Sequence, residues 1–209
     1  MPVGDSHLAF AEAAAADGVE LVLDKAFAWL TELGHITLED LAADPPEGAT
    51  AEALGAAAEA LDDIYIALGG DIDVLVSCRA NLFLPVDLVH EPSGTLIELD
   101  EPHHFTSFRL TAFDRYPPEV PLGFDIEAYR ERCRQGAAEF DGFARAQAGK
   151  GFGIGGIQRQ RAYRDALRDL ATPAMGHPPL VRIVADDGDG AAAYRRNQES
   201  LLSLLGAAR

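Results

Sequence analysis

Hydrophobic and polar residues follow one another along the chain with two different periods, and each period predicts one kind of element. Apolar residues spaced three and four apart, which is typical of an amphipathic helix, recur through much of the sequence. Helices are predicted over residues 18–33, 37–42, 50–68, 108–116, 125–148, 157–170 and 191–205. Thr37 and Thr50 are expected to act as N-caps. The small and polar residues 1–17 are expected to be frayed.

A period of two predicts strands, and strands are predicted at 72–76, 82–89, 95–99 and 180–184. Pro92-Ser93-Gly94 separates the second strand from the third, and so short a connection implies an antiparallel hairpin. The last strand follows a helix, so a right-handed crossover is expected. This order of elements predicts an α/β fold with a mixed central β-sheet and flanking helices.

Charge restricts the partners that the chain is expected to bind. The chain carries 34 acidic and 17 basic side chains, which gives a formal net charge of −17. Such a surface repels nucleic acid unless positive charge is concentrated in one place, and it suits a basic protein partner. Arginines are concentrated in two segments, which contain Arg130, Arg132 and Arg134, and Arg159, Arg161, Arg164 and Arg168.

Composition also bears on location. Hydrophobic residues make up 48% of the 209, enough to form a core. No apolar run approaches the roughly 18 residues that cross a bilayer, and the first residues lack the pattern of a secretory signal. Cys78 and Cys133 are too few for a disulfide framework and are expected to be buried thiols. A cytoplasmic location without a membrane partner is therefore the default expectation.

Carboxylates interrupt two of the predicted strands, and these are the main candidates for a functional site. Asp87 lies in the second strand, and Glu98 and Asp100 end the third. A charge in an apolar strand is costly to bury unless it is paired or binds a metal. Alternation places Glu98 and Asp100 on one face, and the hairpin allows Asp87 to share it. Three converging carboxylates would suit Mg²⁺ or Mn²⁺, which prefer oxygen ligands.

A histidine pair follows these carboxylates. His104 comes four residues after Asp100, where its imidazole is suited to act as a general acid or base or to hold a phosphate. His103 is the alternative for that role. His90 and His177 are expected to have structural roles.

The same residues resemble the motif of a known nuclease superfamily. Asp87, followed about ten residues later by Glu98-x-Asp100, resembles the core motif of the PD-(D/E)xK (restriction-endonuclease-like) nucleases. The segment Glu98-Leu99-Asp100-Glu101-Pro102-His103-His104 resembles the E-x-D-G-x-x-H subgroup, which includes very-short-patch-repair-like endonucleases. That subgroup continues with a helix rich in Asp and Arg and then a G-x-x-(v/l)-x-R strand. This sequence resembles it at Tyr163-Arg164-Asp165, Arg168-Asp169, Gly176 and Leu180-Val181-Arg182-Ile183. Asp100 stands where the superfamily usually has lysine, and Glu101 replaces the subgroup's glycine.

The resemblance implies a function, a site and a domain layout. The function would be metal-dependent hydrolysis of nucleic acid, with DNA preferred to RNA, in repair, restriction or defence. Asp87 and Glu98 would hold Mg²⁺ or Mn²⁺, with Asp100 and His104 completing the catalytic set. Substrate phosphates would contact Arg161, Arg164 and Arg168. Residues 1–48 would be a helical N-terminal extension, and 49–209 a nuclease-like domain with a helical insertion at about 106–149.

Two other interpretations remain open at this stage. In the first, the chain is a catalytically inactive descendant of the nuclease fold that acts as an interaction or inhibitory module. In the second, it is an unrelated α/β enzyme that uses His104 and a carboxylate. The negative charge and the missing lysine favour the first of these. Arg164 and Arg168 would then pair with Asp165, Asp169 or Asp87 rather than with substrate.

Three further patterns suggest ligand contacts but favour structural roles. Gly151-x-Gly153-x-x-Gly156 resembles a dinucleotide loop but follows no predicted strand, so a flexible loop is the better interpretation. The aspartates at 186–190 lack the glutamate of an EF-hand and predict a turn. Aromatic residues of the 105–149 segment are expected in the core, although they could stack on bases. They are Phe108, Tyr116, Phe124, Tyr129, Phe140 and Phe143.

Overall fold

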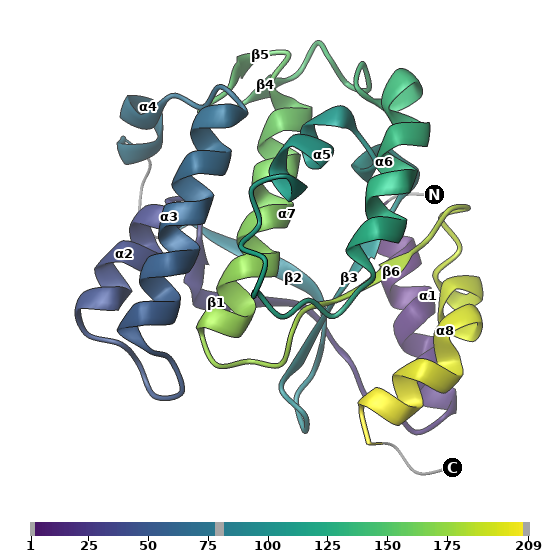
Figure 1. The fold of residues 1–209 in the computed structure, drawn as a ribbon. Helices are drawn as coiled ribbons and strands as arrows, with labels where there is room; N and C mark the ends of the chain where they lie inside the picture. The colour runs from purple at the N-terminus through teal and green to yellow at the C-terminus, as the bar shows by residue number, and fades with distance from the viewer. Residues whose placement is uncertain (1–2, 78–81, 207–209) are drawn as a thin grey trace.

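The computed structural model describes residues 3–77 and 82–206, and its centre is a mixed β-sheet flanked by helices, as expected (Figure 1). The sheet contains β1 (Val22–Thr31), β2 (Phe83–His90), β3 (Thr95–Asp100) and β6 (Val181–Val184), in the order β1-β2-β3-β6. β2 runs antiparallel to both β1 and β3, whereas β6 runs parallel to β3. The α/β class predicted from the sequence is therefore confirmed.

The hairpin that carries the candidate carboxylates is confirmed as well. His90 pairs with Thr95 and Leu88 pairs with Ile97, so the register brings Asp87 opposite Glu98. α7 (Ile157–Ala174) then connects toward β6, where Val181 lies opposite Ile97. A helix in this connection is what a parallel pair of strands requires.

Helices cover both faces of the sheet. α1 (Val3–Ala16) and α8 (Gly190–Leu204) pack on one face, where Ile97 and Leu99 join their hydrophobic cluster. The other face packs against α7, α3 (Ala51–Ala67) and α5 (Ser107–Phe113), and Leu96 belongs to that cluster (Figure 1). Alternation along β3 consequently turns Glu98 and Asp100 toward α7.

Six further elements complete the part of the chain that the structure describes. They are α2 (His35–Ala43), α4 (Ile72–Val76), η1 (Pro102–His104), α6 (Ile126–Phe140), β4 (Ala148–Gly149) and β5 (Gly153–Ile154). Thr50 caps α3, with its side chain accepting from the Ala53 backbone N–H, as expected. α2 begins at His35, so Thr37 lies inside the helix and is not its N-cap. α6 ends at Phe140, and the glycine-rich segment after it forms the small β4–β5 hairpin.

The N-terminal predictions are wrong in two places. Residues 3–16 form α1 and are not frayed, because Phe10 and Ala14 are fully buried against α8 and the sheet. Residues 22–31 form β1 and not a helix. As a strand they pair with the edge of β2, whose backbone N–H and C=O groups would otherwise lack partners in the sheet. Residues 1–48 therefore do not form a wholly helical extension.

The predicted strand at 72–76 is also wrong, since these residues form α4. Asp71 favours the helix because its carboxylate accepts hydrogen bonds from the backbone N–H groups of Asp73 and Val74. Cys133 is buried as expected, whereas Cys78 lies outside the described residues. Of the helices that the structure describes, none is long and apolar enough to cross a membrane.

The contact between α1 and α8 leads to a stability prediction. A Cβ added at Gly190 would lie 1.7 Å from the Ser6 carbonyl oxygen, so Gly190→Ala must push the two helices apart. Overpacking of this kind costs about 1–3 kcal/mol, and thermal unfolding should show the loss. Gly55→Ala is the matched control, because the space around Gly55 in α3 is open. That change is expected to be neutral or slightly stabilising, and equal destabilisation by both would contradict the packing argument.

Candidate functional site

A pocket of about 210 Å³ lies where β2 and β3 meet the first half of α7. It brings together six of the residues singled out from the sequence: Asp87, Glu98, His104, Arg161, Arg164 and Arg168. The remaining lining residues are His7, Leu99, Glu101, His103, Ile157, Gln160 and Asp165. Asp100 does not line the pocket, because its side chain points into a buried cluster of charges described below.

Asp87 and Glu98 form the floor of this pocket. The Asp87 backbone N–H donates to Glu98 Oε1 at 3.2 Å, and the Leu99 N–H donates to Asp87 Oδ2 at 2.9 Å. Side-chain oxygens thus accept from backbone groups at the point where the regular pairing of the two strands stops at Leu88. These bonds hold the two carboxylates beside each other.

Burial makes this pair of carboxylates costly to ionise. Desolvation raises the pKa of Glu98 from 4.5 to about 8, and the neighbouring Asp87 adds to the rise. Desolvation likewise raises the pKa of Asp87 from 3.8 to about 6. At neutral pH the pair therefore retains a proton unless a further cation compensates its charge.

The three arginines of α7 line one wall of the pocket but differ in their partners. Arg168 lies with Nε 3.1 Å from Glu98 Oε1 and donates to the Pro85 carbonyl at 2.8 Å. Arg164 binds Glu32 at 2.9 Å. Arg161 contacts Gln158, and no ion pair within 4.0 Å joins it to an acidic group among residues 3–77 and 82–206. Burial lowers the pKa of Arg161, so its charge is incompletely compensated.

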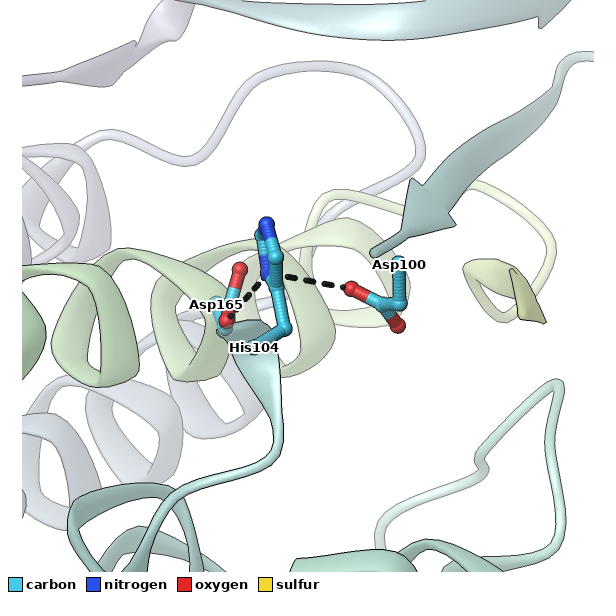
Figure 2. A group of neighbouring side chains, drawn as sticks. All are labelled: Asp100, His104 and Asp165. Atoms are coloured by element: carbon cyan, nitrogen blue, oxygen red, sulfur yellow. Dashed lines mark hydrogen bonds and ion pairs between the residues drawn. The ribbon is translucent and has the colours of Figure 1, made fainter. Parts of the chain in front are cut away.

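His104 is oriented by two aspartates from different elements (Figure 2). Its Nδ1 lies 3.2 Å from Asp100 Oδ1 and 3.2 Å from Asp165 Oδ2. Ionised carboxylates only accept hydrogen bonds, so this geometry places a proton on Nδ1. Figure 2 shows the second ring nitrogen pointing away from both aspartates. In the neutral ring that nitrogen, Nε2, is the acceptor and is suited to general base chemistry.

Asp100 belongs to a buried network of charges. Arg109 donates to both of its oxygens at 3.2 and 3.3 Å, and Arg182 Nη1 donates to Oδ1 at 2.9 Å. Arg182 also binds Asp169 at 2.6 Å, and Arg109 lies 3.5 Å from Asp165. The two guanidinium groups hold the pKa of Asp100 below its usual value. The arrangement assigns Asp100 to positioning His104 and to stabilising the core.

One group of three potential metal ligands is present in the part of the chain that the structure describes. Ligand atoms of Asp100, His104 and Asp165 lie within 4.8 Å of one another. Arg109 and Arg182 already compensate both aspartates, and the pKa of Asp165 lies well below its usual value for the same reason. A metal ion here would have to approach two buried guanidinium groups. Asp87 and Glu98, whose pKa values are raised, are the better candidates for binding a cation.

Two residues near the site, His7 and Arg109, carry no clear functional signal in the sequence. His7, which lies 3.5 Å from Asp87 Oδ2, belongs to the segment that was expected to be frayed. Arg109 was not singled out, although its burial within a seven-residue helix makes it central to the charge network. His103 lines the pocket beside His104, and burial lowers its pKa to about 4. His103 is therefore neutral at physiological pH.

No model of a known protein family, no curated protein and no solved structure matches the chain. The resemblance described above thus depends on the motif residues alone. What the pocket does chemically has to be argued from the positions of Asp87, Glu98, His104 and Arg161.

Proposed function

We propose that the protein is a metal-dependent phosphodiesterase that cleaves nucleic acid, DNA more readily than RNA, and that its sheet is a restriction-endonuclease-like core. One observation carries this proposal. A buried carboxylate, Glu98, and a half-buried one, Asp87, lie side by side on neighbouring strands at the floor of a pocket, and arginines and an oriented histidine form its walls. The order of motif-bearing elements supports the same family, since β2 and β3 are followed by α7 and by Arg182 in β6.

Mg²⁺ or Mn²⁺ fits this pair of carboxylates. Both ions prefer oxygen ligands and keep several waters, so two carboxylates suffice to hold one beside a substrate phosphate. The raised pKa values of Asp87 and Glu98 mean that a cation would relieve an existing electrostatic cost. Once bound, the ion would lower the pKa of a water molecule and offset negative charge on the phosphate.

The side chains that surround the proposed metal site are suited to the remaining roles in such a reaction, which are proton transfer and phosphate binding. His104 Nε2 would accept the proton of the attacking water, with Asp100 and Asp165 holding the ring in place. Arg161 would bind a phosphate oxygen, because its guanidinium lines the pocket and no acidic group of the described residues lies within ion-pair distance of it, although Asp165 and Glu101 attract it from farther away. Arg164 and Arg168 would act mainly through Glu32 and Glu98, to which they are already bound.

Metal binding tests the proposal directly. Calorimetric titration with Mg²⁺ or Mn²⁺ should show binding that disappears in Asp87→Ala. Both carboxylates must be ionised to bind the ion, and their pKa values are about 6 and about 8. The apparent affinity should therefore rise as the pH increases from 6 to 8, with release of protons, and should level off above about 8. Binding that is absent, or that does not depend on pH, would count against a metal site here.

Arg161 leads to a separate prediction. Arg161→Ala should weaken oligonucleotide binding by about 10- to 150-fold, since a charge-assisted contact to phosphate contributes about 1.5–3 kcal/mol. Arg195→Ala is the control, because Arg195 is an exposed arginine of α8. Fluorescence anisotropy with a labelled oligonucleotide would measure both. If the two variants lose affinity equally, the effect is one of overall charge and Arg161 does not contact the phosphate.

A catalytically inactive nuclease fold is the second candidate, and one contact favours it. Arg168 lies 3.1 Å from Glu98 and supplies positive charge where a metal ion would otherwise do so. The net charge of −17 would then suit a basic protein partner. The two proposals differ in the metal titration, because the inactive fold is expected to bind no divalent ion at Asp87.

A further inference from the structure

An exposed aromatic ring lies beside the pocket. Phe143 follows α6 and is 46% exposed, and it belongs to none of the hydrophobic clusters formed by the described residues. Its ring stacks on His103, with centroids 4.9 Å apart and an interplanar angle of 20°. His103 itself lines the pocket. Phe143 is therefore one ring away from the place proposed for the phosphate, and the expectation that it lies in the core is wrong.

Buried polar contacts hold this pair of rings in position. Gln158, at the start of α7, is 2% exposed and donates to the His103 carbonyl at 3.0 Å and to the Phe140 carbonyl at 2.9 Å. A single buried amide thus ties the segments that carry the two rings. Asp141 adds to this anchor by accepting from the Ser107 N–H at 2.8 Å and from the Ser107 hydroxyl at 2.7 Å.

Such an anchor is informative because the ring that it holds remains in contact with water. Leaving an aromatic surface exposed forgoes the free energy gained on burial. These hydrogen bonds fix the backbone just before Phe143, at Phe140 and Asp141, so the exposure of the ring does not result from a loose chain. A planar apolar ligand that stacked on Phe143 would recover that free energy.

We propose that His103 and Phe143 form a stacking platform for an unpaired nucleobase of the substrate, so that single-stranded or locally opened nucleic acid is bound in preference to an intact duplex. This inference rests on the proposed function, which places a substrate phosphate in the adjacent pocket. Bases in a duplex are stacked on their neighbours and cannot reach a protein ring, whereas an unpaired base can. Stacking of this kind tolerates any base, so the platform selects for strand state rather than for sequence.

The test compares strands that differ in their bases but not in their phosphates. Three labelled oligonucleotides are used: a single strand, its duplex, and the same strand with abasic sites in place of the bases. All proteins in this comparison carry Glu98→Gln, and EDTA replaces Mg²⁺ in the buffer, so that no strand is cleaved during the titration. Binding to the single strand should be about tenfold tighter than to the abasic strand, and also tighter than to the duplex.

Phe143→Ala should remove this difference, whereas Phe83→Ala should leave it intact. Phe83 is a suitable control because it is an equally exposed phenylalanine (48%) that does not line the pocket. A Phe143→Trp variant adds a direct signal, since the indole should be quenched by the single strand and not by the abasic strand. The buried Trp29, 7% exposed, provides a background that should not change.

Each outcome separates this inference from the proposed function. Equal affinity for normal and abasic strands, or unchanged selectivity in Phe143→Ala, would overturn the platform even if the wild-type protein hydrolyses nucleic acid. Base-dependent binding that requires Phe143 would support the platform. If the wild-type protein then cleaved none of the strands with any metal, the platform would stand and the hydrolytic function would fail.

Discussion

Replacing Glu98 with glutamine is expected to reduce metal-dependent hydrolysis of nucleic acid by at least about a hundredfold. Residues that merely orient metal ligands contribute 10–100-fold to activity, so the loss of a proposed ligand should cost no less. Glutamine keeps the size of the side chain but removes the charge that binds the ion. The measurement is cleavage of a labelled oligonucleotide with Mg²⁺ and with Mn²⁺.

Glu91→Gln is the matched control, because Glu91 lies on the same hairpin and binds Lys25 away from the pocket. It should retain full activity. Equal rates in the wild type and in Glu98→Gln would show that Glu98 takes no part in the reaction. Intact substrate with the wild-type protein under all metal conditions would reject the hydrolytic function itself.

Glu98→Gln has a second expected effect, on stability. Burial raises the pKa of Glu98 to about 8, so the folded chain binds this proton more tightly than the unfolded chain does. The stability contributed by the protonated group is complete below its ordinary value of 4.5 and is lost as the pH rises to about 8. Glutamine does not ionise, so the variant does not lose this stability as the pH rises. Without metal and above pH 8, Glu98→Gln should therefore unfold at the same temperature as the wild type or a higher one.

Local patterns were sufficient to predict the hairpin and part of the site. A four-residue turn, residues 91–94, fixes how β2 and β3 pair, and that register alone brings Asp87 opposite Glu98. The periodicity of α7 was equally clear, so the arginines on its pocket-facing side were found together. In both cases the information lies within a few residues along the chain.

The missed features depend on contacts between distant segments. The spacing of the apolar residues of β1 is compatible with a helix as well as with a strand. The segment forms a strand because it pairs with the edge of β2. Asp100 has the same sequence context as Glu98, yet its partners Arg109 and Arg182 come from a different helix and a different strand. Periodicity does not indicate which carboxylate will pair with two arginines. It therefore cannot distinguish Asp100, which binds these arginines, from Glu98, the candidate metal ligand.

That distinction makes Asp100→Asn the second prediction with a large expected effect. Asparagine keeps the shape of the side chain but leaves Arg109 and Arg182, which are 1% and 4% exposed, without the charge that they share. Removing one member of a buried ion pair costs about 3–5 kcal/mol. For a chain of this length, thermal unfolding should occur roughly 6–20 °C lower.

Asp114→Asn provides the comparison, because Asp114 pairs with Arg130 at the surface and is 57% exposed. Its removal should change stability by less than about 1 kcal/mol. The pH dependence gives a further check. The arginines hold the pKa of Asp100 below 3.8, so its contribution is present above that pH and is lost as the pH falls further. The difference in the free energy of unfolding between Asp100→Asn and the wild type should therefore become smaller at acidic pH.

The same variant decides whether Asp100 positions other groups or binds the metal. A positioning role predicts that Asp100→Asn, measured well below its unfolding temperature, binds Mg²⁺ nearly as tightly as the wild type. Its rate should still fall, because His104 then has only Asp165 as an ionised partner to orient its ring. If Asp100 were a ligand, metal affinity would be lost together with activity. The two patterns are opposite, since the arginines that stabilise the fold through Asp100 also neutralise the charge that a metal ion would need.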